Sequence, residues 1–99
     1  MQTNNTEKNN RGCIHCYVLG KVQGVSYRKY TKKYADEHGI KGWVKNLPDG
    51  RVEIMACGDA IQLEVFISCL QEGSPSSEVS KIVRNFWQYQ EYESFNIIK

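Results

Sequence analysis

Hydrophobic and polar residues alternate over residues 13–19, which is the pattern of a β-strand with one buried face. The face expected to pack against helices carries Ile14, Cys16 and Val18. The opposite face carries Cys13, His15 and Tyr17. The pattern therefore predicts a strand at an early position in the domain, with its two faces in different surroundings.

A helical period replaces the alternation after residue 26. The residues that recur on one helical face are Tyr27, Thr31, Tyr34, Ala35 and His38. Gly39 follows in the position where a left-handed glycine closes a helix. We interpret His38 as a partly buried structural histidine, because nothing near it in sequence pairs with it.

The middle of the chain predicts a hairpin and a second helix. Strands over residues 40–46 and 51–57 flank a tight turn at residues 47–50. Gly58 is expected to end the second of these strands, and Asp59 to cap a helix together with Gln62. The apolar stripe of that helix is Leu63, Phe66, Ile67 and Leu70, and it stops before Gly73.

Two further strands are predicted near the end of the chain. Residues 79–89 are rich in β-branched and aromatic side chains, but their alternation is broken, which indicates a bulge or bend. Phe95, Ile97 and Ile98 indicate a short terminal strand. The order of elements predicts an α+β, ferredoxin-like two-layer sandwich of βαββαβ type, with an antiparallel sheet in which strands one and three are adjacent.

Composition limits the class of protein. The chain has 99 residues, of which 40% are hydrophobic and 24% charged, so we expect one domain over residues 13–99 and a disordered polar tail over residues 1–12. The net charge of +2 is too small for bulk nucleic-acid binding, and no apolar run approaches a membrane span. No signal peptide is visible, so the expected location is the cytoplasm. The expected state is a monomer.

The four cysteines do not form a zinc-binding pattern. Cys13 and Cys16 point to opposite faces of one strand, so we expect no metal site. Cys13 and Cys57 share the outer face of the predicted sheet, at the start of strand one and the end of strand three. Antiparallel pairing of these strands would place them side by side, which predicts a disulfide under oxidising conditions, with Cys16 and Cys69 free.

The loop between the first strand and the first helix predicts an anion site. Residues 20–28 read Gly-Lys-Val-Gln-Gly-Val-Ser-Tyr-Arg. Two glycines allow a turn that aims several backbone N–H groups at one point, and the helix N-terminus adds partial positive charge. Arg28 lies one turn into the helix, where its guanidinium can bind two oxygens of a phosphate or carboxylate. The alternative is an ordinary strand-to-helix turn with a solvated arginine.

Asn46 lies at the end of a strand that runs parallel to strand one in the predicted topology. The loop and Asn46 then share one edge of the sheet, so Arg28 and Asn46 can converge on one ligand. Alternatively, Asn46 only initiates the turn that follows it.

These two segments resemble the motifs of the acylphosphatase family. Its first motif, Gly-x-Val-Gln-Gly-Val-x-(Phe/Tyr)-Arg, is matched by residues 20–28, and its second, Gly-aromatic-small-basic-Asn-x3-Gly-x-Val-x5-Gly, by residues 42–58. The resemblance implies hydrolysis of small acyl phosphates to carboxylate and phosphate, without metal or cofactor, with phosphate or sulfate as inhibitor. It implies that Arg28 binds the phosphoryl group and that Asn46 orients the attacking water. The backbone of Gln23, Gly24, Val25, Ser26, Tyr27 and Arg28 completes the implied substrate site.

Two departures and two alternatives accompany this resemblance. His38 stands where the family often has leucine, and residues 77–78 replace a small-and-basic pair. The same fold hosts RNA-recognition modules, and His15, Tyr17 and Trp43 would project from the open sheet face. A non-catalytic module of a larger maturation enzyme is the other alternative.

Overall fold

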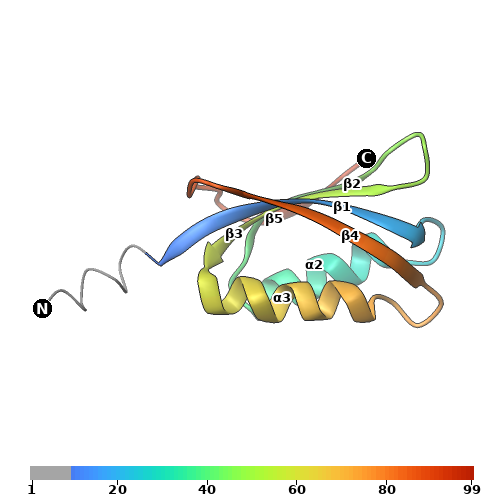
Figure 1. Cartoon of the computed structure of the whole chain (residues 1–99), viewed down its shortest axis with the longest axis horizontal. Coiled ribbons are helices and arrows are strands. Elements are labelled where there is room, and N and C mark those ends of the chain that lie inside the picture. Colours follow the sequence, from blue (N-terminus) through green and yellow to red (C-terminus); the bar gives the residue numbers. More distant parts are fainter. Residues whose placement is uncertain (1–9) are drawn as a thin grey trace, which may run out of the picture.

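The computed structural model describes residues 10–99. They contain two helices and five strands. In chain order they are β1 (Arg11–Lys21), α2 (Tyr27–Glu37), β2 (Lys41–Asn46), β3 (Val52–Asp59), α3 (Ala60–Glu72), β4 (Glu78–Trp87) and β5 (Phe95–Ile98) (Figure 1). None of the helices in this part of the chain is long and apolar enough to cross a membrane.

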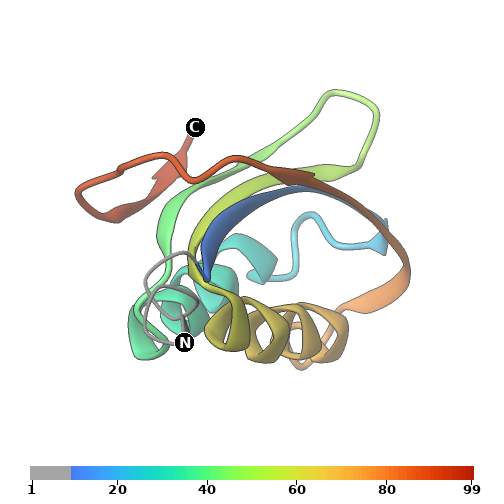
Figure 2. The same ribbon diagram turned by 60° about the vertical axis from the view of Figure 1, so that its left-hand side comes forward.

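The strands form one sheet in the order β4-β1-β3-β2-β5. Neighbouring strands are antiparallel except β2 and β5, which run parallel. Both helices lie on one face of the sheet, as Figure 2 shows. The predicted ferredoxin-like sandwich and the adjacency of β1 and β3 are confirmed. The sheet is mixed rather than purely antiparallel, because the short terminal strand joins it alongside β2.

The core lies between the sheet and the helices. Ile14, Cys16 and Val18 are fully buried there, as the alternation of β1 predicts. All four residues of the predicted α3 stripe are buried, and α2 buries Tyr27, Thr31 and Ala35. Gly39 has the predicted left-handed conformation, with φ 68°.

Several element boundaries differ from the predicted ones. β1 begins at Arg11, inside the segment expected to be a tail, and residues 1–9 of that expected tail lie outside the described residues. Gly58 does not end β3, because β3 continues to pair with β1 as far as Asp59. Asp59 is the N-cap residue of α3, as predicted, but it makes no side-chain capping bond, and the backbone N–H of Ala60 donates to the carbonyl of Asn10.

A bulge interrupts β4 within the predicted segment. Leu19 pairs with Lys81 and Gly20 with Val79, so Ser80 is the extra residue. Gly20 lies opposite the bulge with φ 128°, and a Cβ there would overlap the carbonyl of Glu78. A glycine is therefore required at the point where β1 turns into the loop.

The outer face of the sheet is partly covered. Cys13 lies directly opposite Cys57, and the structure has a disulfide between them. Tyr89 and Tyr92, from the connection between β4 and β5, pack against this disulfide and Met55. The free cysteines among the described residues are Cys16 and Cys69.

Candidate active site

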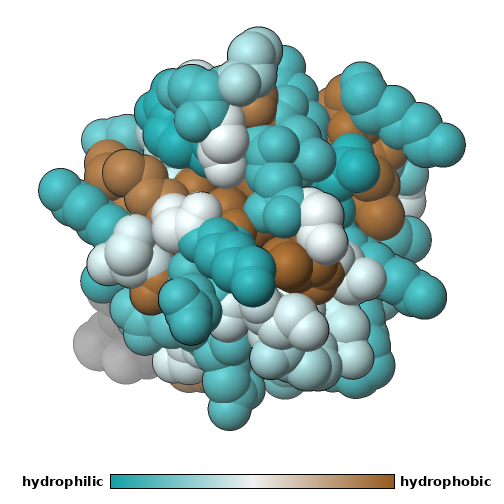
Figure 3. Space-filling model, turned by 90° about the vertical axis from the view of Figure 1, so that its right-hand side faces the viewer, coloured by the Kyte–Doolittle hydropathy of each residue, from teal (hydrophilic) through white to brown (hydrophobic). Residues whose placement is uncertain are grey.

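A hollow of about 320 Å³ lies at the end of the molecule where β1 and β2 finish. The segments that meet at this end include the loop after β1 and the hairpin after β2 (Figure 1). Figure 3 shows the same end as a mostly hydrophilic surface with small hydrophobic patches. The residues that line the hollow are Val22, Gln23, Gly24, Ser26, Tyr27, Arg28, Lys29, Asn46, Ile97 and Lys99.

The backbone of the loop is shaped to bind an anion. Gly24 and Ser26 have left-handed φ values of 73° and 64°, on either side of Val25. Such alternation turns successive N–H groups toward one side of the chain. Among the hydrogen bonds of residues 10–99, none uses the backbone N–H groups of residues 23–28. Together with the N-terminus of α2, these free donors favour a negatively charged ligand.

Arg28 is held at the edge of the hollow by the terminal strand. One of its Nη atoms donates to the carbonyl of Ile98 at 3.2 Å. In the part of the chain that the structure describes, no carboxylate pairs with Arg28. Lys29 and Lys99 also line the hollow. The guanidinium therefore keeps uncompensated charge and free donors beside the loop.

Asn46 carries a buried polar atom that finds no partner in the part of the chain that the structure describes. The residue is the last of β2 and pairs with Val52 of β3. Its Oδ1 is the one buried side-chain oxygen or nitrogen of residues 10–99 without a hydrogen-bond partner. Leaving such an atom unpaired costs about 1–3 kcal/mol. Buried polar atoms of this kind are usually satisfied by water or ligand.

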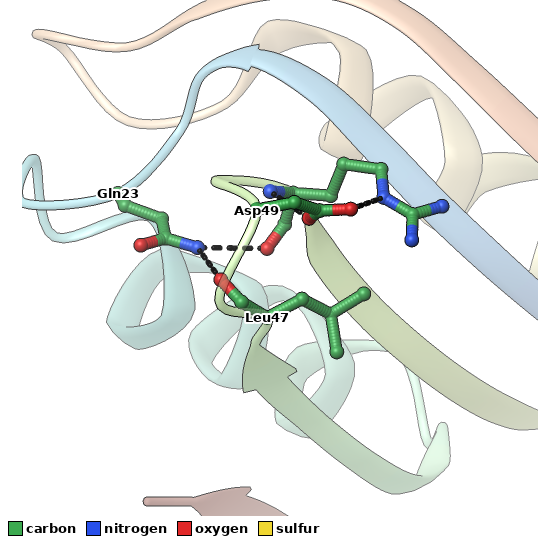
Figure 4. A network of polar contacts seen from close by, with 4 residues as sticks. Gln23, Leu47 and Asp49 are labelled. Atoms are coloured by element: carbon green, nitrogen blue, oxygen red, sulfur yellow. Dashed lines mark hydrogen bonds and ion pairs between the residues drawn. The ribbon is translucent and has the colours of Figure 1, made fainter.

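The side chain of Gln23 fastens the loop to the hairpin that follows Asn46. Its Nε2 donates to the carbonyls of Leu47, at 2.9 Å, and Arg51, at 2.8 Å, so both amide hydrogens are used (Figure 4). Asp49 in turn accepts from the backbone N–H and the Nε of Arg51. This contact with Arg51 lowers the pKa of the Asp49 carboxyl. The hairpin and the loop thus form one unit around the hollow.

The resemblance implies only a backbone role for Val25 and Tyr27, and the side chains of both pack in or against the core. Val25 does not line the hollow, and its carbonyl accepts a hydrogen bond from Ser74 at 2.6 Å. The side chain of Tyr27 enters the core, where its hydroxyl donates to the carbonyl of Leu70 at 2.7 Å. Only the backbone of Tyr27 is available to a ligand. The other expected residues, including Gln23, Gly24, Ser26, Arg28 and Asn46, are brought together.

The sequence pattern did not predict two groups of residues at or near the hollow. Ile97 and Lys99 reach the hollow only because β5 pairs with β2. Ser74 and the side chain of Gln23 act through contacts between distant segments. Within residues 10–99, no group of three or more histidine, cysteine, aspartate or glutamate side chains is placed to hold a metal ion.

Comparison with known proteins identifies the family. A model of the acylphosphatase family matches residues 14–97. The chain belongs to the acylphosphatase family. It is 42% identical to an acylphosphatase of Legionella pneumophila (strain Corby) over 86 residues, which cover 87% of this chain and 94% of that protein.

Solved structures agree with this assignment. An acylphosphatase from Coxiella burnetii superposes with a TM-score of 0.88 at 38% identity, over 93% of this chain and 97% of the other. An acylphosphatase from Bacillus subtilis superposes with a TM-score of 0.87 at 37% identity, over 89% of this chain and 99% of the other. The expected class of enzyme, a hydrolase of acid anhydrides, is confirmed with the family. This result favours an enzyme over the RNA-recognition module considered as an alternative.

Proposed function

We propose that this protein hydrolyses the carboxyl–phosphate bond of small acyl phosphates by direct attack of a water molecule held by Asn46. In this proposal, Arg28 and the backbone N–H groups of residues 23–28 hold the phosphoryl group. The observation that carries it is the buried Oδ1 of Asn46, which has no partner among the described residues and belongs to a residue that lines the same hollow as Arg28 and the loop residues Gln23, Gly24 and Ser26. An acceptor for water thus lies beside donors for an anion.

The reaction needs little from the protein beyond charge and position. The phosphorus–oxygen bond to the carboxylate breaks while a bond from phosphorus to the water oxygen forms. A carboxylate is a good leaving group and needs no general acid, so the barrier lies in gathering charge on the phosphoryl group and placing water in line. The guanidinium and the N–H groups serve the first need, and Asn46 serves the second.

Asn46 positions the water and does not remove its proton. A carboxamide accepts a hydrogen bond from water through its oxygen and donates through its nitrogen, but it is not a base at neutral pH. The proton of the attacking water therefore passes to an oxygen of the phosphate. No covalent intermediate is formed, and the mechanism requires no metal ion.

Turnover of benzoyl phosphate, measured with and without a chelator, tests this proposal. We expect equal rates in both conditions and competitive inhibition by inorganic phosphate or sulfate, because both resemble the bound phosphoryl group. Glycerol phosphate should react far more slowly, because its alkoxide leaving group needs an acid. A chelator-sensitive rate that a divalent ion restores would contradict the mechanism.

A further inference from the structure

Ser74 contacts the loop between β1 and α2 from a distant part of the chain. It lies in the connection between α3 and β4, is 3% exposed, and donates from its Oγ to the carbonyl of Val25 at 2.6 Å. This donor and acceptor are 49 residues apart in the sequence. A serine hydroxyl buried at this level is normally placed to make a specific bond.

Ser74 is itself held in place by Ser77. The backbone N–H of Ser74 donates to the Oγ of Ser77 at 2.9 Å, and that hydroxyl donates to the carbonyl of Ser74 at 2.8 Å. The backbone N–H of Ser77 also donates to the same carbonyl at 3.0 Å. The hydroxyl of Ser74 therefore projects from a closed turn and has a fixed direction.

The bond to Val25 sets the direction of the next N–H group. The peptide between Val25 and Ser26 is trans, so its carbonyl oxygen and its N–H point to opposite sides. Because Ser74 holds the carbonyl on the core side, the N–H of Ser26 is turned to the other side. Gly24 and Ser26 line the hollow, whereas Val25 and Ser74 do not.

The same bond holds Ser26 in a conformation that it does not favour. Ser26 has φ 64°, and it is the one residue other than glycine with positive φ among residues 10–99. Residues other than glycine disfavour this left-handed region, because the Cβ atom comes too close to the backbone. Without the bond, rotation of the Val25–Ser26 peptide would bring φ of Ser26 to a negative value. It would also turn a carbonyl oxygen toward the bound anion.

We propose that Ser74 is a positioning residue for acyl phosphate hydrolysis. Its hydroxyl fixes the Val25–Ser26 peptide so that the N–H of Ser26 donates to the phosphoryl group. This inference rests on the proposed function of the hollow. It predicts that Ser74 controls affinity for phosphate without touching it.

The test is the affinity of inorganic phosphate, measured by calorimetry on wild type and three variants with intact disulfide. Ser74→Ala should weaken phosphate binding about tenfold or more, which is the usual effect of losing a hydrogen bond to an ion. Ser74→Thr keeps the hydroxyl and should bind more tightly than Ser74→Ala. Ser76→Ala is the matched control, because Ser76 is exposed in the same connection, and it should bind as wild type does.

The outcomes separate this inference from the function on which it rests. Phosphate affinity of Ser74→Ala within twofold of wild type, with only a lower melting temperature, would show a merely structural role and overturn the inference. If Arg28→Ala bound phosphate with the same affinity as wild type, that result would instead overturn the proposed function.

A wild-type measurement can overturn the inference even if Ser74→Ala does not fold. The amide proton of Ser26 should shift strongly in an NMR titration with phosphate, because it forms a new bond to an anion. An unshifted Ser26 amide at saturating phosphate would overturn the inference.

Discussion

Strand β1 starts next to the Cys13–Cys57 disulfide and ends at the loop that precedes α2. Polar groups are paired and covered at the first end of the strand, and several are left without a partner among the described residues at the other. At the first end, the disulfide accepts a hydrogen bond at Cys13 Sγ from the N–H of Gln90 at 3.2 Å and is covered by tyrosines. At the other end, the N–H groups of residues 23–28 and the Oδ1 of Asn46 find no partner among the described residues.

Under the proposed function, this difference separates residues that stabilise the protein from residues that act on substrate. An unpaired buried polar atom destabilises the folded chain, so it is retained where a ligand will pair with it. Substitutions at the loop end should therefore change activity more than stability. Substitutions at the disulfide end should do the reverse.

The largest expected effect is that of Arg28→Ala on turnover. The variant loses the guanidinium at the edge of the hollow, so kcat/KM for benzoyl phosphate should fall by a transition-state loss of about 3–5 kcal/mol. The melting temperature should change little, because Arg28 makes only one hydrogen bond, to Ile98, within residues 10–99. Lys33→Ala, which removes a charge from an exposed part of α2, is the control and should keep full activity. Equal losses in both variants would contradict a local role for Arg28.

Asn46 is expected to affect turnover without affecting phosphate binding. Asn46→Ala should lower kcat by about two orders of magnitude or more while the inhibition constant of phosphate stays near that of wild type. The stability of the variant should not fall, because the lost Oδ1 makes no hydrogen bond within residues 10–99. Asn46→Asp should be as slow as Asn46→Ala and bind phosphate worse, because like charges repel. A rate restored by Asp would mean that the residue acts as a base.

The fold was predictable from sequence because each element carries its own pattern. The alternation of β1 and the stripe of α3 report burial directly, since residues close in sequence share one face. The boundary at Gly58 was not predictable, because pairing with residues near Arg11 extends β3 past the glycine. In the same way, the backbone N–H of Ala60 bonds to the carbonyl of Asn10, while the N-cap residue Asp59 makes no side-chain capping bond.

The site was predictable only where its residues lie in two short motifs. Arg28 and Asn46 follow a loop and a turn that the sequence marks with glycines. Ser74 has no such mark in the sequence, because its proposed role depends on a contact with Val25 that exists only after the chain has folded. A buried serine in a polar connection carries no sequence signal of its own.

At the disulfide end, the expected effect is on stability. Reduction, or replacement of both Cys13 and Cys57 by alanine, should lower the free energy of unfolding by about 2–4 kcal/mol, because the bond closes a long loop in the unfolded chain. Cys13 and Cys57 are 44 residues apart in the sequence, so the disulfide closes a long loop. Activity of the folded protein should stay within about twofold, since neither cysteine lines the hollow.

Urea unfolding of the wild type with and without reductant measures this effect, and peptide mapping establishes the linkage. Cys16 provides an internal control for thiol chemistry, because burial raises its pKa to about 12 and should keep it unreactive in the folded protein. A cross-link between Cys13 and Cys16 would contradict the register of β1 and β3.

The smallest expected effect is that of Tyr27→Phe. Tyr27 tests the comparison between the two ends most directly, because it follows the loop in sequence while its side chain is buried in the core. Tyr27→Phe removes the hydroxyl that donates to Leu70 and should lower the free energy of unfolding at pH 7 by about 1–2 kcal/mol. Activity at pH 7 should change less than twofold, since only the backbone of Tyr27 lines the site. Tyr30→Phe is the control, because the Tyr30 hydroxyl makes no hydrogen bond within residues 10–99.

The pH dependence of stability distinguishes the core role from a role in binding. Burial raises the pKa of the Tyr27 phenol, so above the ordinary tyrosine pKa of about 10 the unfolded chain loses this proton while the folded chain keeps it. The contribution of Tyr27 to stability is therefore present below about pH 10 and is lost as the pH rises further. Urea unfolding between pH 8 and pH 11 should show a shallower alkaline loss of stability in Tyr27→Phe than in wild type or Tyr30→Phe. Identical slopes would mean that the Tyr27 hydroxyl is not held in the core, and the loop end would then contribute nothing to stability through this residue.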